Sequence, residues 1–286
     1  MATLREIKRK INSINSTRTI TRTMKMVSAS KLRRAQEELE KIRAYAVKIE
    51  ELTGRVIANV PPESHPLLTE REQIKKVLIV SIASDRGLCG GFNVNIGMKA
   101  ENFVAENRDK YERIAAYAVG KKVKDYLLRR KVEVIKDLTE IKKVDKGLVD
   151  SIASDLIRYY TEGEFDKIYL GYTHFLSPVK QLVMFDEFLP IKASHTYEDA
   201  EYLYEPDKNK IIEKLIPKYI STKIYFAILD SQTSEHGARM SAMENATTNS
   251  GEMIDNLTLI YNKRRQETIT NDMMDIVGGA EALRGK

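Results

Sequence analysis

The sequence predicts an α/β protein in which a compact, mostly parallel sheet is inserted between two long terminal helices that pair as an antiparallel coiled coil. Three observations predict this fold. A heptad repeat of apolar residues runs from residue 4 to residue 56, a similar repeat runs through residues 211–277, and strand and helix patterns alternate between them. We therefore expect three segments: an N-terminal helix (1–60), an α/β domain (61–209) and a C-terminal helix (210–286).

The N-terminal helix is predicted from apolar residues that recur at steps of three and four. They are Leu4, Ile7, Ile11, Ile14, Leu32, Ala35, Leu39, Ile42, Ala46, Ile49 and Val56. No proline precedes Pro61, and Gly54 is the only glycine before it. At ~1.5 Å per residue the helix would be about 80 Å long. A helix of that length needs a partner helix to cover its apolar stripe.

One turn in the middle of this helix breaks the apolar pattern. Four successive heptad positions are polar: Arg18, Thr21, Lys25 and Ser28. Three apolar residues stand one place out of phase with them: Ile20, Met24 and Val27. For any single charge, a solvated face is a sufficient explanation. Because a whole turn is polar, we expect the helix here to face another chain rather than its own partner.

The middle of the chain alternates strand and helix patterns. Pro61 and Pro62 end the first helix. Buried strands are predicted at 75–83, 114–119, 132–135 and 167–173, an alternating edge strand at 181–189, and helices at 93–108, 121–130 and 146–161. Residues 193–209 are polar and aromatic and are expected to form a loop.

A second long helix is predicted after Pro206. Five isoleucines stand at steps of four: Ile212, Ile216, Ile220, Ile224 and Ile228. A stripe at steps of three and four follows: Met243, Ala246, Ser250, Met253, Leu257 and Ile260. Residues 224–229 could also form a strand, but length and context favour a helix of about 100 Å. Pairing the two long helices gives each a partner, and a seven-residue repeat predicts a left-handed supercoil.

Composition and charge restrict the function. The chain has 286 residues and a net charge of +6. No apolar run approaches ~20 residues, so no membrane span is expected. The lone Cys89 excludes an intrachain disulfide. With a start unlike a signal or transit peptide, this fits a reducing cytosolic compartment. Residues 1–34 carry ten Lys and Arg but one acid, Glu6. This basic stretch predicts an acidic partner, either nucleic acid or an acidic protein surface.

The best candidate for a catalytic loop is residues 84–93, which follow the first strand of the α/β domain. Phosphates bind at such positions, but the glycines fit neither a dinucleotide fingerprint nor a P-loop. Cys89 has no histidine near it in sequence, and the four histidines are scattered singly. The acids of residues 196–207 lack the order of a calcium loop. We expect no catalytic residue, no cofactor and no metal site.

Several motifs together resemble the gamma subunits of bacterial F-type ATP synthases. The resemblance covers residues 4–12, 20–34, 84–93 and 202–207. It is strongest near the C-terminus, at residues 239–243, 246–249, 261–266 and 269–280. One departure is Asp272, where that family usually has glutamate.

This resemblance implies a non-catalytic rotor shaft, present once per complex, inside the ring of alpha and beta subunits. Proton-driven or sodium-driven rotation of the c-ring would turn it. Contacts with the beta subunits are implied for Lys25, Arg33, Arg34, Arg239, Arg265 and Gln266. A foot on the c-ring, beside the epsilon subunit, is implied for Tyr202, Tyr204 and Glu205. The chain would meet the membrane only through the complex, at the cytoplasmic face of the bacterial plasma membrane, and would bind no nucleic acid.

Two other functions compete on physical grounds. A nucleic-acid-binding coiled coil would also carry a basic stretch before heptads, but here the heptads begin before the basic stretch, at Leu4. A nucleotide-dependent enzyme would use residues 84–93. We expect neither duplex DNA nor ATP to bind the isolated chain.

Overall fold

Two very long helices are the first and the last elements of the chain, and all other elements lie between them in sequence. The computed structural model describes residues 3–141, 144–192 and 207–284. Helix α1 spans Leu4–Ala58 and helix α5 spans Lys208–Arg284. The chain divides into two compact units. The terminal unit comprises Met1–Val27 and Ala242–Lys286, the central unit comprises Ser28–Ser241, and each contains part of both helices.

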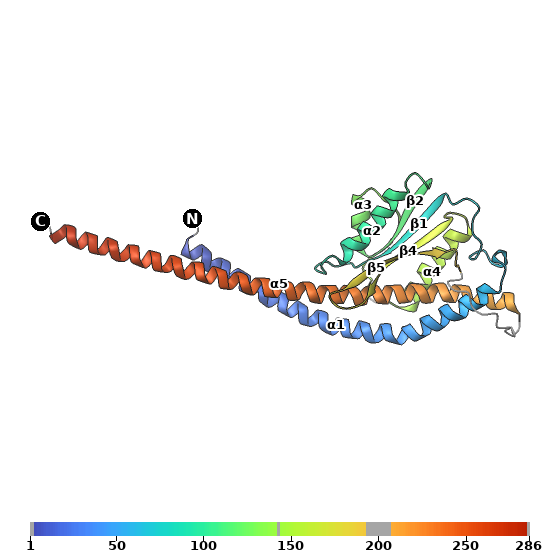
Figure 1. Ribbon diagram of the computed structural model, residues 1–286, viewed down its shortest axis with the longest axis horizontal. Coiled ribbons are helices and arrows are strands. Elements are labelled where there is room, and N and C mark those ends of the chain that lie inside the picture. The colour runs from blue at the N-terminus through green and yellow to red at the C-terminus, as the bar shows by residue number, and fades with distance from the viewer. Residues whose placement is uncertain (1–2, 142–143, 193–206, 285–286) are drawn as a thin grey trace. The chain divides into compact units, whose positions relative to one another are not determined.

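Within each unit α1 and α5 lie side by side (Figure 1). In the terminal unit, Lys25 Nζ lies 2.6 Å from Glu244 Oε1. One turn earlier on α1 and one turn later on α5, the Thr21 and Thr247 hydroxyl oxygens lie 2.8 Å apart. The two helices are therefore antiparallel. In the central unit, Lys223 Nζ on α5 lies 2.7 Å from Glu50 Oε1 on α1.

The heptad frame of α1 holds through its polar turn, and our expectation for that turn was wrong. Thr21 is only 8% exposed and Ser28 is buried, whereas Ile20 and Val27 are exposed. The polar side chains stay in the seam because they meet polar partners there. Thr21 pairs with a hydroxyl, Lys25 pairs with a carboxylate, and a Cβ on Gly251 would lie 3.5 Å from the Arg18 guanidinium.

The seam on α5 also differs from the predicted stripe. Met243 is buried as expected, but Met253 and Ile260 are exposed. The partly buried residues instead follow the frame Thr247, Ser250, Ile254, Leu257 and Tyr261. Ser250 and Leu257 are common to both series, whereas the alternate positions lie one residue later, at Thr247, Ile254 and Tyr261, and Thr247 is a position that an apolar-only count passes over.

The central unit contains the predicted sheet. Its strands are β1 (Lys76–Ile82), β2 (Arg113–Val119), β3 (Glu133–Leu138), β4 (Lys167–Phe175) and β5 (Gln181–Leu189). The strand order is β3-β2-β1-β4-β5. Strands β1 to β4 are parallel, and β5 is an antiparallel edge strand, as its alternating pattern predicted. The mostly parallel five-stranded sheet between two long helices confirms the predicted fold class.

Helices cover both faces of the sheet (Figure 1), and each face has its own hydrophobic core. Helices α2 (Phe92–Asn107) and α3 (Lys121–Arg129) cover one face around Ile79. Helix α4 (Lys146–Thr161), the early part of α5 and Val56 of α1 cover the other face. All five isoleucines from Ile212 to Ile228 are buried there in helical backbone. The early part of α5 is thus one of the helices that cover the sheet of the α/β domain.

The predicted foot lies outside the described residues. Tyr202, Tyr204 and Glu205 fall between residues 192 and 207, and α5 begins at Lys208. After α1, a short 3-10 helix, Pro62–Ser64, occupies the proline-rich turn.

Candidate interaction surfaces and the loop after strand β1

The loop at residues 84–93 is held by its own polar groups. The Ser84 amide donates to Asn93 Oδ1 at 2.9 Å, and Asn93 Nδ2 donates to the Arg86 carbonyl at 3.1 Å. Leu88 and Gly90 have positive φ angles of 62° and 56°, which a tight strand-to-helix turn requires. The polar side chains of Ser84 and Asn93, at the two ends of the loop, therefore bond each other and the loop backbone.

Side chains from this loop and from α5 tie the loop to the rest of the sheet. Asp85 accepts from the amides of Lys121 at 2.8 Å and Ile141 at 3.1 Å. Arg239 on α5 donates to the Gly87 carbonyl from Nε at 3.3 Å and from Nη2 at 3.2 Å. The loop therefore joins the ends of β1, β2 and β3 to the long helix.

Helix α5 also fills the crevice in which doubly wound sheets bind their ligands. That crevice lies beyond the carboxyl ends of the strands where the strand order reverses, here between β1 and β4. Asp230 of α5 accepts a hydrogen bond from the Phe175 amide at 2.9 Å, and Ser231 Oγ accepts one from the Thr173 amide at 3.0 Å. The sheet binds a helix of its own chain at this place.

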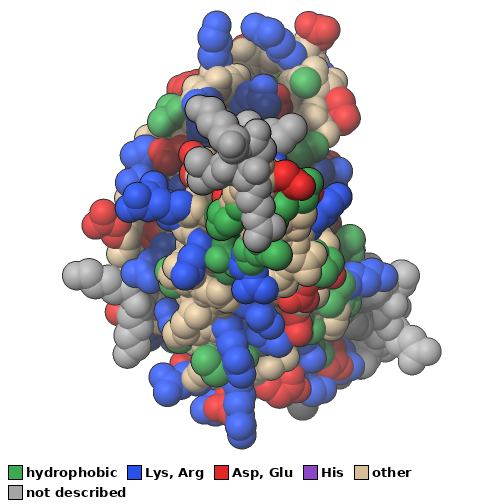
Figure 2. Space-filling model, turned by 90° about the vertical axis from the view of Figure 1, so that its left-hand side faces the viewer, with side chains coloured by type: hydrophobic (Ala, Val, Ile, Leu, Met, Phe, Trp, Pro, Cys, Tyr) green, Lys and Arg blue, Asp and Glu red, His purple; other side chains and the backbone are tan. Residues whose placement is uncertain are grey.

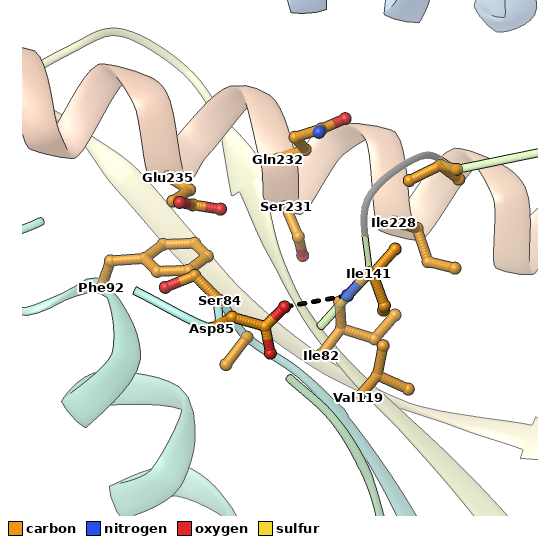
Figure 3. Close-up of a pocket in the computed structure, with 12 residues that line it drawn as sticks. Ile82, Ser84, Asp85, Phe92, Val119, Ile141, Ile228, Ser231, Gln232 and Glu235 are labelled. Carbon is orange, nitrogen blue, oxygen red and sulfur yellow. Dashed lines mark hydrogen bonds between the residues drawn. The ribbon is translucent and has the colours of Figure 1, made fainter. Parts of the chain in front are cut away.

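A cavity of about 70 Å³ remains between α5 and the ends of β1 and β2 (Figure 3). Ser231 and Glu235 point into it from α5, and Ser84 and Asp85 lie across from them (Figure 3). Glu235 Oε1 lies 2.7 Å from Arg239 Nη2, and burial raises the pKa of this carboxyl. Ligand pockets are typically ~300–1,000 Å³. This space suits a few water molecules and is too small for a nucleotide.

The other candidate reactive groups have structural surroundings. Cys89 is buried against Phe92 and Ala238, and burial raises the pKa of its thiol, which disfavours the nucleophilic thiolate. Among the described residues no three His, Cys, Asp or Glu side chains gather as metal ligands would.

The basic residues named from the sequence fall into three environments. Arg33 and Arg34 are exposed on α1, and the Arg33 side chain is 85% exposed. Arg265 and Gln266 are exposed on α5. Lys25 faces α5 and pairs with Glu244. The Arg239 side chain is 11% exposed and is bound within the chain to Glu235 and to the Gly87 carbonyl.

Exposed apolar residues are a feature that sequence reasoning missed. On α1 they include Ile20, Met26 and Val27; near the end of α5 they are Ile269, Met273, Met274, Ile276 and Val277. Figure 2 shows hydrophobic side chains (green) reaching the surface among basic and acidic ones. The out-of-phase position of Ile20 and Val27 was the available signal, since residues beside a seam that stays in frame must face outward.

These features define a class of protein: an α/β domain inserted between two long helices that pair with each other and carry exposed basic and apolar side chains. A family model described as ATP synthase matches residues 3–283. The chain is 44% identical to the ATP synthase gamma chain of Moorella thermoacetica, over 99% of this chain and 100% of the relative. It is 40% identical to that of Geobacter metallireducens, over the full length of both.

Solved structures of ATP synthases contain chains with a similar fold. A chain in the central stalk and c-ring of the Tetrahymena thermophila mitochondrial ATP synthase is 27% identical, with a TM-score of 0.61 over 79% of this chain and 99% of that one. A Euglena gracilis mitochondrial ATP synthase chain, 18% identical, shares the fold with a TM-score of 0.69 over 98% of this chain and 94% of that one.

The chain belongs to the ATP synthase gamma chain family. Its role is that of a non-catalytic rotor shaft in the ATP synthase. Among the described residues, no helix combines the length and apolarity needed to cross a membrane.

Proposed function

We propose that this shaft turns inside a ring of alternating alpha and beta subunits and carries the rotation of the c-ring to their catalytic sites. Residues 1–60 and 210–286 form the shaft, and residues 61–209 form the domain that rests on the c-ring beside the epsilon subunit. One copy serves each complex, and the driving ion is a proton or sodium. Through the complex, the chain is held at the cytoplasmic face of the bacterial plasma membrane.

The observation that carries this proposal is the solvent exposure of the C-terminal end of α5. Every residue from 265 to 281 is exposed, including five large apolar side chains. Gly278 and Gly279 lie in this stretch with no other group within 4 Å of where a Cβ would sit. Each glycine costs a helix about 1 kcal/mol relative to alanine, and a lone helix is marginal in water. A surrounding protein collar would cover the apolar side chains and support the helix.

The mechanism requires a rod whose surface differs around its circumference. On α1, Arg33 and Arg34 are exposed, and Ile20 and Val27 present apolar surface. Such a rod touches three identical catalytic sites differently, so each orientation favours a different open or closed state at each site. Rotation then shifts the nucleotide affinities in turn, and nucleotide binding reciprocally turns the rod.

The basic stretch is proposed to face acidic loops of the beta subunits. Arg33 and Arg34 are the strongest candidates because their side chains reach solvent, and Lys25 can contribute after exchanging its intramolecular partner Glu244. Arg265 and Gln266 would contact the ring farther along α5. Tyr202, Tyr204 and Glu205 are proposed as the foot on the c-ring.

The decisive experiment is assembly with alpha and beta subunits, followed by measurement of rotation and of coupling between hydrolysis and ion pumping. Neutralising the basic face with K25Q/R33Q/R34Q is expected to weaken coupling without unfolding the chain. A matched control neutralises three exposed basic residues of the α/β domain, K99Q/R108Q/K146Q. Failure of the parent chain to assemble or rotate contradicts the shaft proposal, whereas equal coupling in both variants contradicts only the assignment of the basic face.

A further inference from the structure

Three buried side chains of α5 form hydrogen bonds to the end of β4. Asp230 Oδ1 accepts from the Phe175 amide at 2.9 Å, and Asp230 Oδ2 lies 2.6 Å from His174 Nδ1. Ser231 Oγ accepts from the Thr173 amide at 3.0 Å, and Ser234 Oγ donates to the Thr173 carbonyl at 3.1 Å. The Asp230 and Ser234 residues are 0% exposed and Ser231 is 2% exposed.

These contacts extend the hydrogen bonding along the edge of β4, with side chains of α5 in place of a neighbouring strand. The pairing of β1 with β4 stops at Ser81 and Gly171, although β4 runs on to Phe175. Alternate residues of a strand direct their amides and carbonyls to the same edge. The groups at Thr173 and Phe175 that β1 leaves without a partner are the ones that α5 satisfies. Three side chains of one helix thus occupy the place of a strand.

The fit allows little rotation of the helix. A Cβ on Gly237 would lie 2.8 Å from Phe175 Cε2 and 3.3 Å from Pro178 Cα, so α5 touches the β4–β5 turn directly. On the other side of the crevice, Arg239 holds the Gly87 carbonyl. Residues 230–239 are therefore fixed to two separate loops of the α/β domain.

The remaining contact between α5 and the sheet is of another kind. From Ile212 to Ile228 the fully buried side chains that pack against the sheet core are aliphatic, and the hydroxyl of the buried Thr222 donates to a carbonyl of its own helix. Apolar contact is non-directional, so such a surface resists separation better than it resists turning. Hydrogen bonds are directional, and breaking one inside a protein leaves a buried group without a partner.

We propose that residues 230–239 of α5 form a torsion key, which fixes the rotation of the helix about its own axis to the sheet. This inference rests on the proposed shaft function. Torque that the c-ring applies to the α/β domain enters the shaft at these residues. Asp230, Ser231 and Ser234 are positioning residues in this scheme, and Gly237 permits the close approach that they need.

The experiment compares two double variants of α5 in the assembled complex. S231A/S234A removes two bonds to β4. T222V/T233V is the matched control, because those threonines are also buried but their hydroxyls donate to carbonyls of their own helix, Lys218 at 2.7 Å and Leu229 at 2.8 Å. With the alpha–beta ring immobilised and a probe on the α/β domain, the angular fluctuation of the stalled rotor reports torsional stiffness.

We expect the angular variance to rise by about twofold or more in S231A/S234A and to stay at the parent value in T222V/T233V, since only the first pair loses directional bonds to the sheet. An unchanged variance in S231A/S234A, in a complex whose parent rotates, would overturn the torsion key and leave the shaft function standing. If S231A/S234A does not assemble, D230N provides the same comparison, because it keeps the side-chain shape while weakening the bonds to His174 and the Phe175 amide. A parent that fails to rotate refutes the shaft function instead.

Discussion

The two ends of α5 differ in the burial of their side chains, although they belong to one uninterrupted helix. Residues 212–238 are packed between the sheet, α4 and α1, and most of their side chains are buried or partly buried. Residues 265–281 are exposed on every side. Between them, residues 243–261 meet α1 along a seam that includes Thr247 and Ser250. The surroundings of α5 therefore lose packing partners stepwise along its length.

This difference shows where the stability of a long helix comes from. Helix propensity alone gives marginal stability in water, and tertiary packing of an apolar face supplies most of the rest. The start of α5 even tolerates Pro217 in its interior, where packing of Ile216 and Ile220 holds the backbone. The far end carries two adjacent glycines and lacks any such packing within the described chain.

The largest expected effect is in amide hydrogen exchange of the isolated chain. Residues 212–238 should exchange about 1,000-fold or more slowly than residues 265–281, because only the former require opening of the sheet core. Mass spectrometry of peptides from both stretches gives the comparison directly. Equal protection of the two stretches would mean that the end of α5 has an additional partner in the isolated chain, and the comparison would fail.

Truncation of a core side chain should distinguish the two stretches by a smaller amount. I220A removes a side chain that is 0% exposed and should lower the free energy of unfolding by about 2–5 kcal/mol, as buried aliphatic truncations do. L259A, at a residue 69% exposed, should change it by about 0.5 kcal/mol or less. Urea unfolding followed by circular dichroism measures both. A similar loss in the two variants would contradict the assigned burial.

Substitution of the polar pair Thr21 and Thr247, between α1 and α5, should raise the stability instead of lowering it. T21L/T247L replaces a hydroxyl pair buried between α1 and α5 by the residues that a coiled coil prefers. Because both partners are replaced together, no polar group is left without a bond, and we expect the terminal unit to gain about 1–2 kcal/mol. Exchange protection of residues 10–27 should rise. Lower protection would show that the hydroxyl pair, rather than apolar contact, specifies the register.

Sequence reasoning succeeded where periodicity alone decides the structure. The frame that begins at Leu4 continues through Thr21 and Ser28 to Val56, and the alternating pattern of β5 identified an edge strand. It failed where polar residues are buried in pairs. Nothing in the residue pattern indicates that Thr21 meets Thr247, so the polar turn was assigned to another chain, and alternate seam positions of α5 were placed at Ala246, Met253 and Ile260 instead of Thr247, Ile254 and Tyr261.

The contacts that join the sheet to the shaft could not be predicted for a related reason. Asp230, Ser231 and Ser234 interrupt an otherwise aliphatic face, and their partners on β4 lie more than fifty residues away in sequence. The same holds for Arg239, whose role in the resemblance was contact with another subunit and whose guanidinium holds Gly87 of its own chain. Long-range hydrogen bonds produce no periodic pattern in the amino-acid sequence.

Acid should weaken the central unit through His236. Burial lowers the pKa of this imidazole from 6.5 to about 4, and its Nδ1 lies 3.5 Å from Arg239 Nη1. The unfolded chain therefore binds a proton that the folded chain does not between about pH 6.5 and pH 4, and stability falls as the pH is lowered through that window. We expect a loss on the order of 1–2 kcal/mol, after allowance for solvent screening.

The variant H236Q isolates this effect. Its unfolding free energy, measured by urea titration from pH 7 to pH 4, should fall less steeply than that of the parent. His65, whose pKa burial also lowers, leaves a residual slope of the same sign in both proteins. Identical slopes for parent and variant would show that the pKa of His236 is not lowered in the folded chain.

The smallest effect concerns the ion pair between Lys25 and Glu244 in the terminal unit. Their side chains are 38% and 53% exposed, so water screens the attraction despite the 2.6 Å separation. E244Q should lower stability by about 0.5 kcal/mol or less, and the difference should shrink further in high salt. E252Q, at an exposed acid on the same helix, provides the baseline. A loss several times larger for E244Q, persisting in high salt, would mean that this pair holds the seam together and that the polar turn is as tightly built as the aliphatic face of residues 212–228.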